Sequence, residues 1–201
     1  IAQSLNLNEI IAQQSIIPNI VFQPFAFFLF FTAALAEMNR SPFDIPVGES
    51  EVVGGPFVEY SGIRWSMFFL AEYTALLIMS ILTVALFLGG WSWPFGEDLG
   101  TFWQIFLTIA KTSLVIFLIF WVRVSVPRLR IDQLMNFCWK VLIPLALLQI
   151  FANGFILVYE LPKFLLTLSS VLLMIALVFI VNKNITNLDS HRVNKENVEV
   201  A

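Results

Sequence analysis

A cluster of carboxylates occupies one short stretch of the sequence, AEMNRSPFDIPVGESEVVGGPFVEY, which covers residues 36–60. Its acidic residues outnumber its one base, Arg40, and they are Glu37, Asp44, Glu49, Glu51 and Glu59. They are interleaved with large apolar residues, and prolines and a Gly-Gly-Pro break bend the chain, which favours a loop packed against other groups. Carboxylates buried in such a loop have shifted pKa values and exchange protons near neutrality. The alternative is an acidic surface loop that is simply solvated.

Two further ionisable residues interrupt long apolar runs. Glu72 lies about 7 residues, or about 10 Å, into its run, and an ionisable group at that depth indicates a functional site. Lys111 is deeper, and Gln104 and Thr108 are spaced to share its helix face, as a water-filled proton path would require. The alternatives are an interfacial glutamate that reaches back to water and a lysine held in a fixed ion pair within a helix-packing stripe.

The elements that carry these residues follow from composition. Hydrophobic residues make up 59% of the 201 residues, charged residues only 12%, and the mean hydropathy is +0.85. Such values exclude an ordinary soluble domain and indicate an integral membrane protein. The apolar runs are apolar on every side, which argues against a β-barrel and predicts an all-α, polytopic transmembrane helix bundle. We expect five spans, at about 18–37, 65–90, 102–122, 139–158 and 164–182.

Basic residues predict the orientation of these spans. The segment after the third span carries Arg123, Arg128 and Arg130, whereas the connection at 91–100 has no lysine or arginine. The basic segment should therefore face the cytoplasm, together with the loop at 38–64 and the tail at 183–201. On this basis alone the arginines are topology anchors and lipid-headgroup contacts.

The two ends of the sequence predict less structure. Residues 1–17 are expected to form a polar or weakly amphipathic surface segment, and the tail at 183–201 a solvated, poorly ordered end. No cleavable signal peptide with a basic region precedes Ile1, and we expect the chain to be a fragment that is incomplete at its N-terminus.

The sequence offers no set of residues for a redox cofactor. One cysteine, Cys138, and one histidine, His191, cannot form a zinc site or an iron–sulfur cluster, and no glycine-rich phosphate-binding motif occurs. We therefore expect no flavin, iron–sulfur cluster or metal on this chain, no nucleic-acid partner, and any redox cofactor to lie elsewhere.

Several motifs together resemble a known family. The segments AEMNRSPFDIPVGESE, VEYSG, FFLAEY and WVRVSVPRLRIDQLM occur in the same order in the quinone-site membrane subunits of respiratory complex I and their chloroplast counterparts. The match covers most of residues 18–150 and corresponds to the C-terminal half to two-thirds of that family. Val47, Pro56 and an additional helix at 164–182 depart from its pattern.

The resemblance implies a role in a proton-translocating NADH-quinone oxidoreductase. The chain would help form the chamber for a quinone (ubiquinone, menaquinone or plastoquinone) and couple quinone reduction to proton translocation. Its partners would be iron–sulfur subunits of the quinone module, antiporter-like membrane subunits and lipid. Its location would be the bacterial inner membrane, with the mitochondrial inner and thylakoid membranes as alternatives.

The resemblance also assigns roles to the residues named above. Glu37, Arg40, Asp44, Glu49, Glu51 and Glu59 fall on the family's charged chamber loop, and Glu72 and Lys111 on its intramembrane proton path. Arg123, Arg128, Arg130 and Asp132 fall on its basic cytoplasmic-side segment.

Three alternatives remain open from the sequence. The first is the related membrane subunit of energy-converting hydrogenases and formate hydrogenlyase, which needs no quinone. The second is a quinone-reducing complex that takes its electrons from ferredoxin or a deazaflavin. The third is a stand-alone transporter, although the sequence shows no inverted repeat and no matching pair of broken helices.

Overall fold

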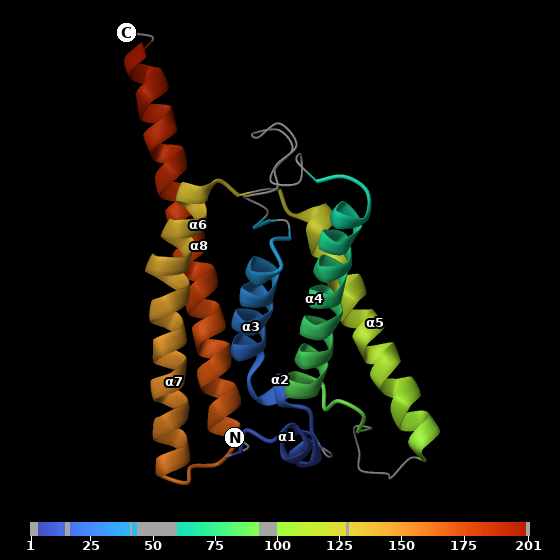
Figure 1. The fold of residues 1–201 in the computed structure, drawn as a ribbon. Coiled ribbons are helices and arrows are strands. Elements are labelled where there is room, and N and C mark those ends of the chain that lie inside the picture. The colour runs from blue at the N-terminus through green and yellow to red at the C-terminus, as the bar shows by residue number, and fades with distance from the viewer. Residues whose placement is uncertain are drawn as a thin grey trace.

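The computed structural model describes residues 4–14, 17–40, 42–43, 60–92, 100–127 and 129–199, and it gives 183–199 as backbone only. All regular structure in these ranges is helical (Figure 1). The helices are α1 (Leu7–Gln13), α2 (Asn19–Phe22), α3 (Pro24–Glu37), α4 (Ile63–Phe87), α5 (Thr101–Ser125), α6 (Ile131–Phe137), a π-helical turn η2 (Cys138–Leu142), α7 (Ile143–Val158) and α8 (Phe164–Glu199).

Four helical segments are long and apolar enough to cross a membrane: Ile63–Phe87, Thr101–Ser125, Ile131–Val158 and Phe164–Asn182. They correspond to the second to fifth predicted spans. The predicted class, a polytopic membrane bundle of α-helices, is therefore confirmed.

The first predicted span is divided in the structure. The helix is interrupted at Gln23, which lies between the short α2 and the 14-residue α3. Pro24 explains the break, because it has no backbone N–H and disfavours helical geometry in the residue before it, while it fits the first position of a new helix. At about 1.5 Å per residue α3 is about 21 Å long, so this segment spans less depth than its neighbours.

The fourth span begins earlier than predicted, and it contains a π-helical turn near its start. Helices α6 and α7 are joined through the π-helical turn, in which the N–H of Ile143 bonds to the carbonyl of Cys138. Pro144 follows directly and cannot donate to the carbonyl four residues before it, which explains why the regular hydrogen-bond ladder is interrupted here.

The last helix also extends further than predicted. Its backbone remains helical to Glu199, whereas the polar tail was expected to be poorly ordered. The segment 164–199 contains no glycine or proline, so no residue in it interrupts the helix.

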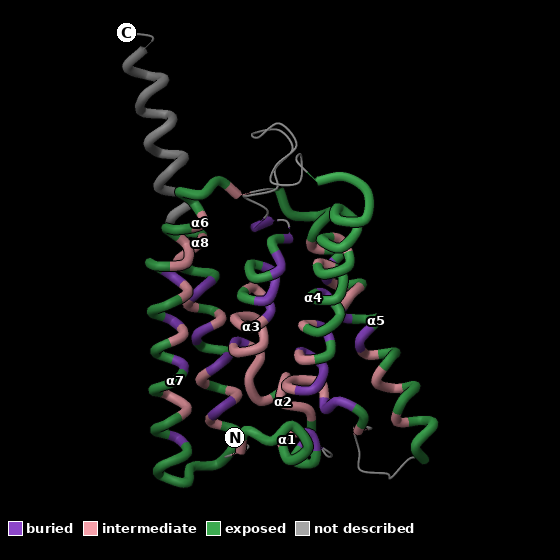
Figure 2. The backbone as a smooth tube through the Cα atoms, viewed as in Figure 1, coloured by how far each residue is buried: buried purple, intermediate pink, exposed green. Residues whose placement is uncertain are grey.

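Helix α3 lies between two helix pairs, α4 with α5 and α7 with α8 (Figure 1). Buried residues mark these inner faces, and exposed residues the outer ones (Figure 2). One core cluster joins α3 to α4 and α5 through Phe31, Leu35, Leu76, Val115 and Ile119. A second joins α3 to η2, α7 and α8 through Phe25, Val141, Leu145, Leu173 and Leu177.

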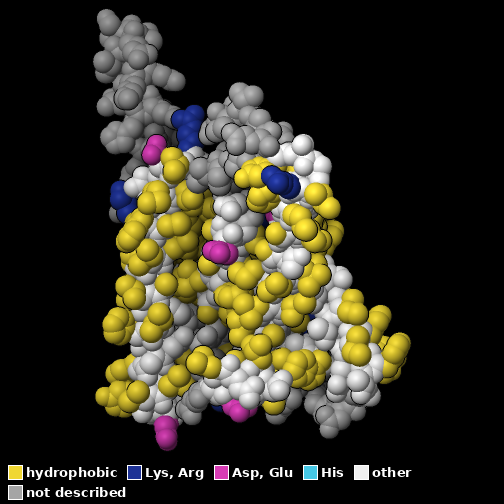
Figure 3. Space-filling model, in the orientation of Figure 1, with side chains coloured by type: hydrophobic (Ala, Val, Ile, Leu, Met, Phe, Trp, Pro, Cys, Tyr) yellow, Lys and Arg dark blue, Asp and Glu magenta, His cyan; other side chains and the backbone are white. Residues whose placement is uncertain are grey.

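The outer surface is mostly hydrophobic. Hydrophobic side chains cover the helices between their ends, and most Lys and Arg side chains on the visible face gather at the end from which the C-terminus leaves (Figure 3). This distribution is the one that a bilayer requires of the outer faces of membrane helices.

The connection after α3 and the basic segment after α5 lie at the same end of the bundle (Figure 1). They are joined directly, because the N–H of Leu129 donates to the carbonyl of Pro42 at 3.1 Å. The structure thus agrees with the predicted placement of these two connections on one side of the membrane.

Candidate functional site

An ion pair joins two of the predicted site residues. Nη1 of Arg40 lies 2.9 Å from Oε1 of Glu72, so the end of α3 is tied to α4. The guanidinium carbon also lies 5.3 Å from the centre of the Tyr73 ring, within range of a cation–π interaction. One cation therefore contacts two consecutive residues of α4.

The backbone after α3 explains how Arg40 reaches this place. Asn39 adopts a left-handed conformation with φ of 47°, which asparagine tolerates better than most residues. The N–H of Arg40 then bonds back to the carbonyl of Leu35 at 3.2 Å, and its carbonyl accepts from the N–H of Phe43 at 2.8 Å. This tight turn directs the Arg40 side chain inward rather than toward water.

The two members of the pair differ in exposure. The Arg40 side chain is 7% exposed, whereas that of Glu72 is 34% exposed. Within the described residues, Nε and Nη2 of Arg40 are buried without a hydrogen-bond partner. An arginine carries five N–H donors and no acceptor, so this buried cation retains capacity for another anionic or carbonyl group.

An apolar groove of about 600 Å³ lies between α3 and the segment formed by η2 and the start of α7. It is lined by Leu29, Ala33 and Glu37 of α3, by Phe43, and by Cys138 and Ile143 across it. Glu37 is exposed and is the only acidic side chain among the groove's lining residues that the structure describes. The groove therefore offers an apolar surface with a carboxylate at the end where the acidic loop begins.

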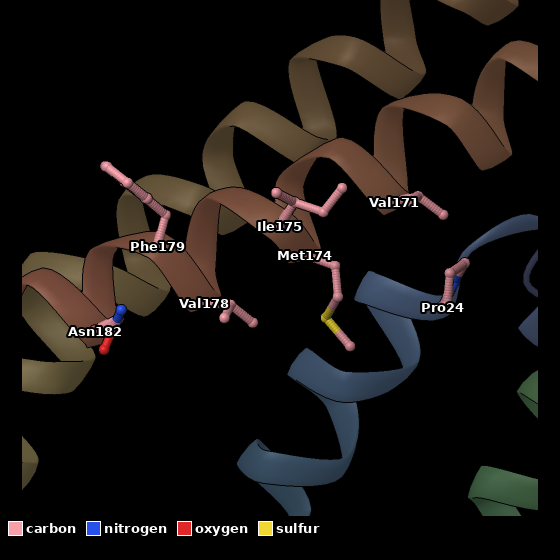
Figure 4. Close-up of a pocket in the computed structure, with 7 residues that line it drawn as sticks. All are labelled: Pro24, Val171, Met174, Ile175, Val178, Phe179 and Asn182. Carbon is pink, nitrogen blue, oxygen red and sulfur yellow. The ribbon is translucent and has the colours of Figure 1, made fainter.

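A second groove, of about 500 Å³, lies between α3 and α8 (Figure 4). Val171, Ile175 and Phe179 come from α8, and Pro24 begins α3 on the other side. No charged residue lines the described part of this groove, so it has the character of a surface that contacts lipid chains.

Lys111 lies far from the ion pair. Its Nζ donates to the carbonyls of Leu88 at 2.8 Å, Gly90 at 3.0 Å and Ser92 at 2.7 Å. Leu88 follows Glu72 by about 24 Å along the axis of α4, at 1.5 Å per residue. The structure thus brings Arg40 and Glu72 together, but it places Lys111 at the C-terminal end of α4.

Thr108 of the predicted polar stripe, and the neighbouring Thr112, bond within their own helix, α5. The hydroxyl of Thr108 donates to the carbonyl of Gln104 at 2.8 Å, and that of Thr112 donates to the carbonyl of Thr108 at 2.7 Å. These hydroxyl protons are engaged along the helix rather than by a neighbouring one.

The remaining predicted residues divide into two groups. Arg123, Arg130 and Asp132 are exposed at the end of the bundle where α3 ends and α4 begins. Outside the described residues lie Asp44, Glu49, Glu51, Glu59 and Arg128.

Three residues that contact Arg40 or the end of α4 were not predicted from the sequence. Tyr73 had a signal, its position next to Glu72. Gln14 and Asn19 had none, because they belong to a polar segment and only their contacts with the end of α4 distinguish them. No group of three His, Cys, Asp or Glu suited to a metal ion occurs within the described ranges.

Comparison with known proteins decides the family. Residues 1–154 match the model of the NADH dehydrogenase family. The chain belongs to this family. The match confirms the resemblance found in the motifs, and it ends before α8 begins.

Curated relatives agree with this assignment. The NADH-quinone oxidoreductase H subunit of Anoxybacillus flavithermus is 52% identical over 155 residues, which are 76% of this chain and 45% of that protein. The corresponding proteins of Carboxydothermus hydrogenoformans and Brevibacillus brevis are 46% and 48% identical, over 77% and 78% of this chain and 43% and 46% of their own lengths. The chain thus spans less than half the length of the curated relatives it matches.

Proposed function

We propose that this chain forms part of the membrane subunit of a proton-translocating NADH-quinone oxidoreductase, helping to build the quinone chamber and to couple quinone reduction to proton translocation. The observation that carries the proposal is the Arg40–Glu72 pair, which links the acidic segment to a membrane helix within residues 1–154, the part of the chain that matches the family model. Iron–sulfur subunits would supply the electrons, and antiporter-like membrane subunits would move the protons. Its place would be the inner membrane of a bacterium, as the bacterial relatives suggest.

The groove between α3 and α7 supports a quinone as the ligand. A quinone combines an apolar tail with a head group that carries two carbonyl acceptors, and ligand sites of this kind are apolar with a few converging polar groups. The groove is apolar, and the Glu37 carboxylate lies among its lining residues, at the end where the head group would arrive.

The coupling step would use the charges around Arg40. Reduction of a quinone to a quinol consumes two electrons and two protons, so it changes the proton demand of the surrounding carboxylates. Carboxylates that interact strongly titrate together rather than singly. An exchange of Arg40 from Glu72 to a carboxylate of the acidic loop would carry the signal into α4.

Lys111 is the second candidate for the proton path. It lies about 24 Å from Glu72 along α4, so a proton passing between them needs intervening water or side chains. Its three hydrogen bonds to carbonyls favour a fixed contact, with backbone oxygens in place of the ion pair that the sequence left open as the alternative.

The double variant E49Q/E51Q tests the proposal in native membranes. We expect it to lower quinone-linked NADH oxidation by about tenfold, the factor that corresponds to about 1.4 kcal/mol of lost stabilisation. Electron transfer from NADH to a soluble artificial acceptor should persist, because that route does not reach the membrane subunit. E9Q, which removes an exposed acid from α1 at the opposite end, is the matched control.

Two outcomes separate the proposal from a failure of assembly. Native gels of the same membranes report how much complex is present, and rates are compared per complex. Unchanged quinone-linked turnover in an assembled E49Q/E51Q enzyme would contradict a chamber role for the acidic loop.

A further inference from the structure

The C-terminal end of α4 is held by polar side chains from other helices. A helix leaves its last four carbonyls without partners inside the helix, and in a membrane these groups need partners from elsewhere. The carbonyl of Ala85 accepts from Nε2 of Gln14 at 3.0 Å, and that of Leu86 accepts from Nδ2 of Asn19 at 3.1 Å. The side chain of Gln14 is almost completely buried, with 1% of the residue exposed.

Lys111 of α5 completes this arrangement. Its ammonium group has three N–H donors, and each bonds to one carbonyl of the turn after α4, those of Leu88, Gly90 and Ser92. The C-terminal end of a helix carries partial negative charge, so a cation placed there is stabilised. The lysine therefore has both its charge and its hydrogen-bond capacity satisfied where it lies.

The shape of the turn is suited to this contact. Gly89 and Gly90 have φ of 73° and 50°, a left-handed conformation that glycine adopts without steric cost. A Cβ atom on Gly90 would come within 2.7 Å of Cδ1 of Ile11, so α1 packs closely against the turn. The turn thus meets α1 on one side and Lys111 on the other.

We propose that Lys111 is a positioning residue that, with Gln14 and Asn19, clamps the end of α4 to α5 and to the α1–α2 segment. We name these three residues the α4 clamp. The clamp fixes the axial position of α4. The same helix carries Glu72, which pairs with Arg40 about 24 Å along the axis from the clamp. The consequence for coupling rests on the proposed function, whereas the clamp itself rests only on the contacts described.

The clamp and a proton carrier make opposite predictions for arginine at this position. A carrier must release its proton, which costs Lys111 one of its three hydrogen bonds. Arginine donates hydrogen bonds and keeps its charge but does not deprotonate in proteins. K111R therefore preserves a clamp and abolishes a carrier, while K111M, which has no donor, abolishes both.

The test uses the assembled enzyme in native membranes. In K111R we expect the ratio of protons translocated to quinone reduced to stay within about twofold of the parent, since charge and donors are retained. In K111M the amides of residues 88–92 should exchange hydrogen about tenfold faster or more, because loss of the clamp allows local opening. S113A, which removes an exposed hydroxyl two residues away on α5, is the matched control and should leave both readouts unchanged.

Q14L provides a second route, because glutamine carries no titratable proton. The clamp predicts faster exchange at 88–92 in Q14L as in K111M, whether or not the bulkier K111R accumulates. An assembled K111R enzyme that reduces quinone without translocating protons would overturn the proposal, and so would unchanged exchange in both K111M and Q14L. If the parent enzyme reduces no quinone, the proposed function is refuted. Faster hydrogen exchange at 88–92 in K111M and Q14L would then still support the clamp.

Discussion

Arg40 and Glu72 form one ion pair but occupy unequal environments. The arginine is nearly buried, with two donors unpaired within the described residues, while the glutamate retains a third of its exposure. Removing one partner of a buried pair leaves an uncompensated charge, and the penalty grows with the burial of the charge that remains. The two single substitutions should therefore differ in cost.

We expect E72Q to destabilise the folded protein more than R40Q does. E72Q leaves the buried guanidinium without an anion, at a cost of about 3 kcal/mol. R40Q leaves a carboxylate that is one-third exposed and that water can solvate, at a cost of about 1 kcal/mol. Thermal unfolding of the purified complex, monitored by aggregation of this chain, measures the order of the two effects.

The double variant R40Q/E72Q serves as the control for this comparison. Because neither charge remains, its loss should be smaller than the sum of the two single losses, by about 0.5–3 kcal/mol for residues in contact. Additive losses, or a larger loss in R40Q than in E72Q, would contradict the pairing geometry.

Both members of the pair were predicted from the sequence, but their pairing was not. Glu72 stood out as a charge within an apolar run, and Arg40 as the one base among the loop acids. Nothing in their separation of 32 positions predicts a contact, because it depends on the left-handed turn at Asn39 and on the register of α3 against α4. Lys111 was likewise found by its depth, while its carbonyl partners depend on a turn that follows another helix.

At the scale of elements, the glycine turn after α4 determines how α1 packs. G90A should lower stability by about 1–2 kcal/mol, because alanine is strained at positive φ and its Cβ would collide with Ile11. G154A is the matched control, since Gly154 lies within α7 and a Cβ there meets nothing within 4 Å. That control should gain about 0.5–1 kcal/mol from helix propensity.

Protease sensitivity of the α1–α4 contact measures the effect of G90A. We expect faster cleavage within residues 4–14 in G90A than in the parent, and no faster cleavage in G154A. Equal cleavage of both variants would show that the turn does not control the docking of α1.

Most helices were predicted from hydropathy alone, since a bilayer requires long apolar runs. The deviations have local causes that hydropathy ignores. Pro24 divides the first span, Pro144 accompanies the π-helical turn, and the lack of glycine and proline allows α8 to continue to Glu199. The clamp on α4 was not predictable, because it requires knowing which surface α1 packs against.

At the scale of the whole molecule, the two ends of the bundle have different characters. One end carries the ion pair, the groove beside Glu37 and the basic segment joined to Pro42. The other end carries the α4 clamp, whose side chains donate to backbone carbonyls and not to charged side chains. Chemistry at the first end and positioning at the second would be connected through α4.

The exposed apolar faces fit the partial coverage of the family. The described chain leaves many large hydrophobic residues of α5 and α7 exposed, and it corresponds to less than half of each curated relative. Exposed apolar faces of this kind are suited to contact with lipid or with other membrane helices.

The central claim, that this region forms a quinone chamber, is tested most directly by photolabelling. The protein is purified gently from its native membrane, labelled with an azide analogue of the quinone, and digested, and the labelled peptides and co-purifying chains are identified by mass spectrometry. We expect label within residues 36–60, suppressed by excess quinone, together with iron–sulfur partners. A solitary chain without label in this segment would contradict the account and leave the acidic loop as a surface feature of a transporter.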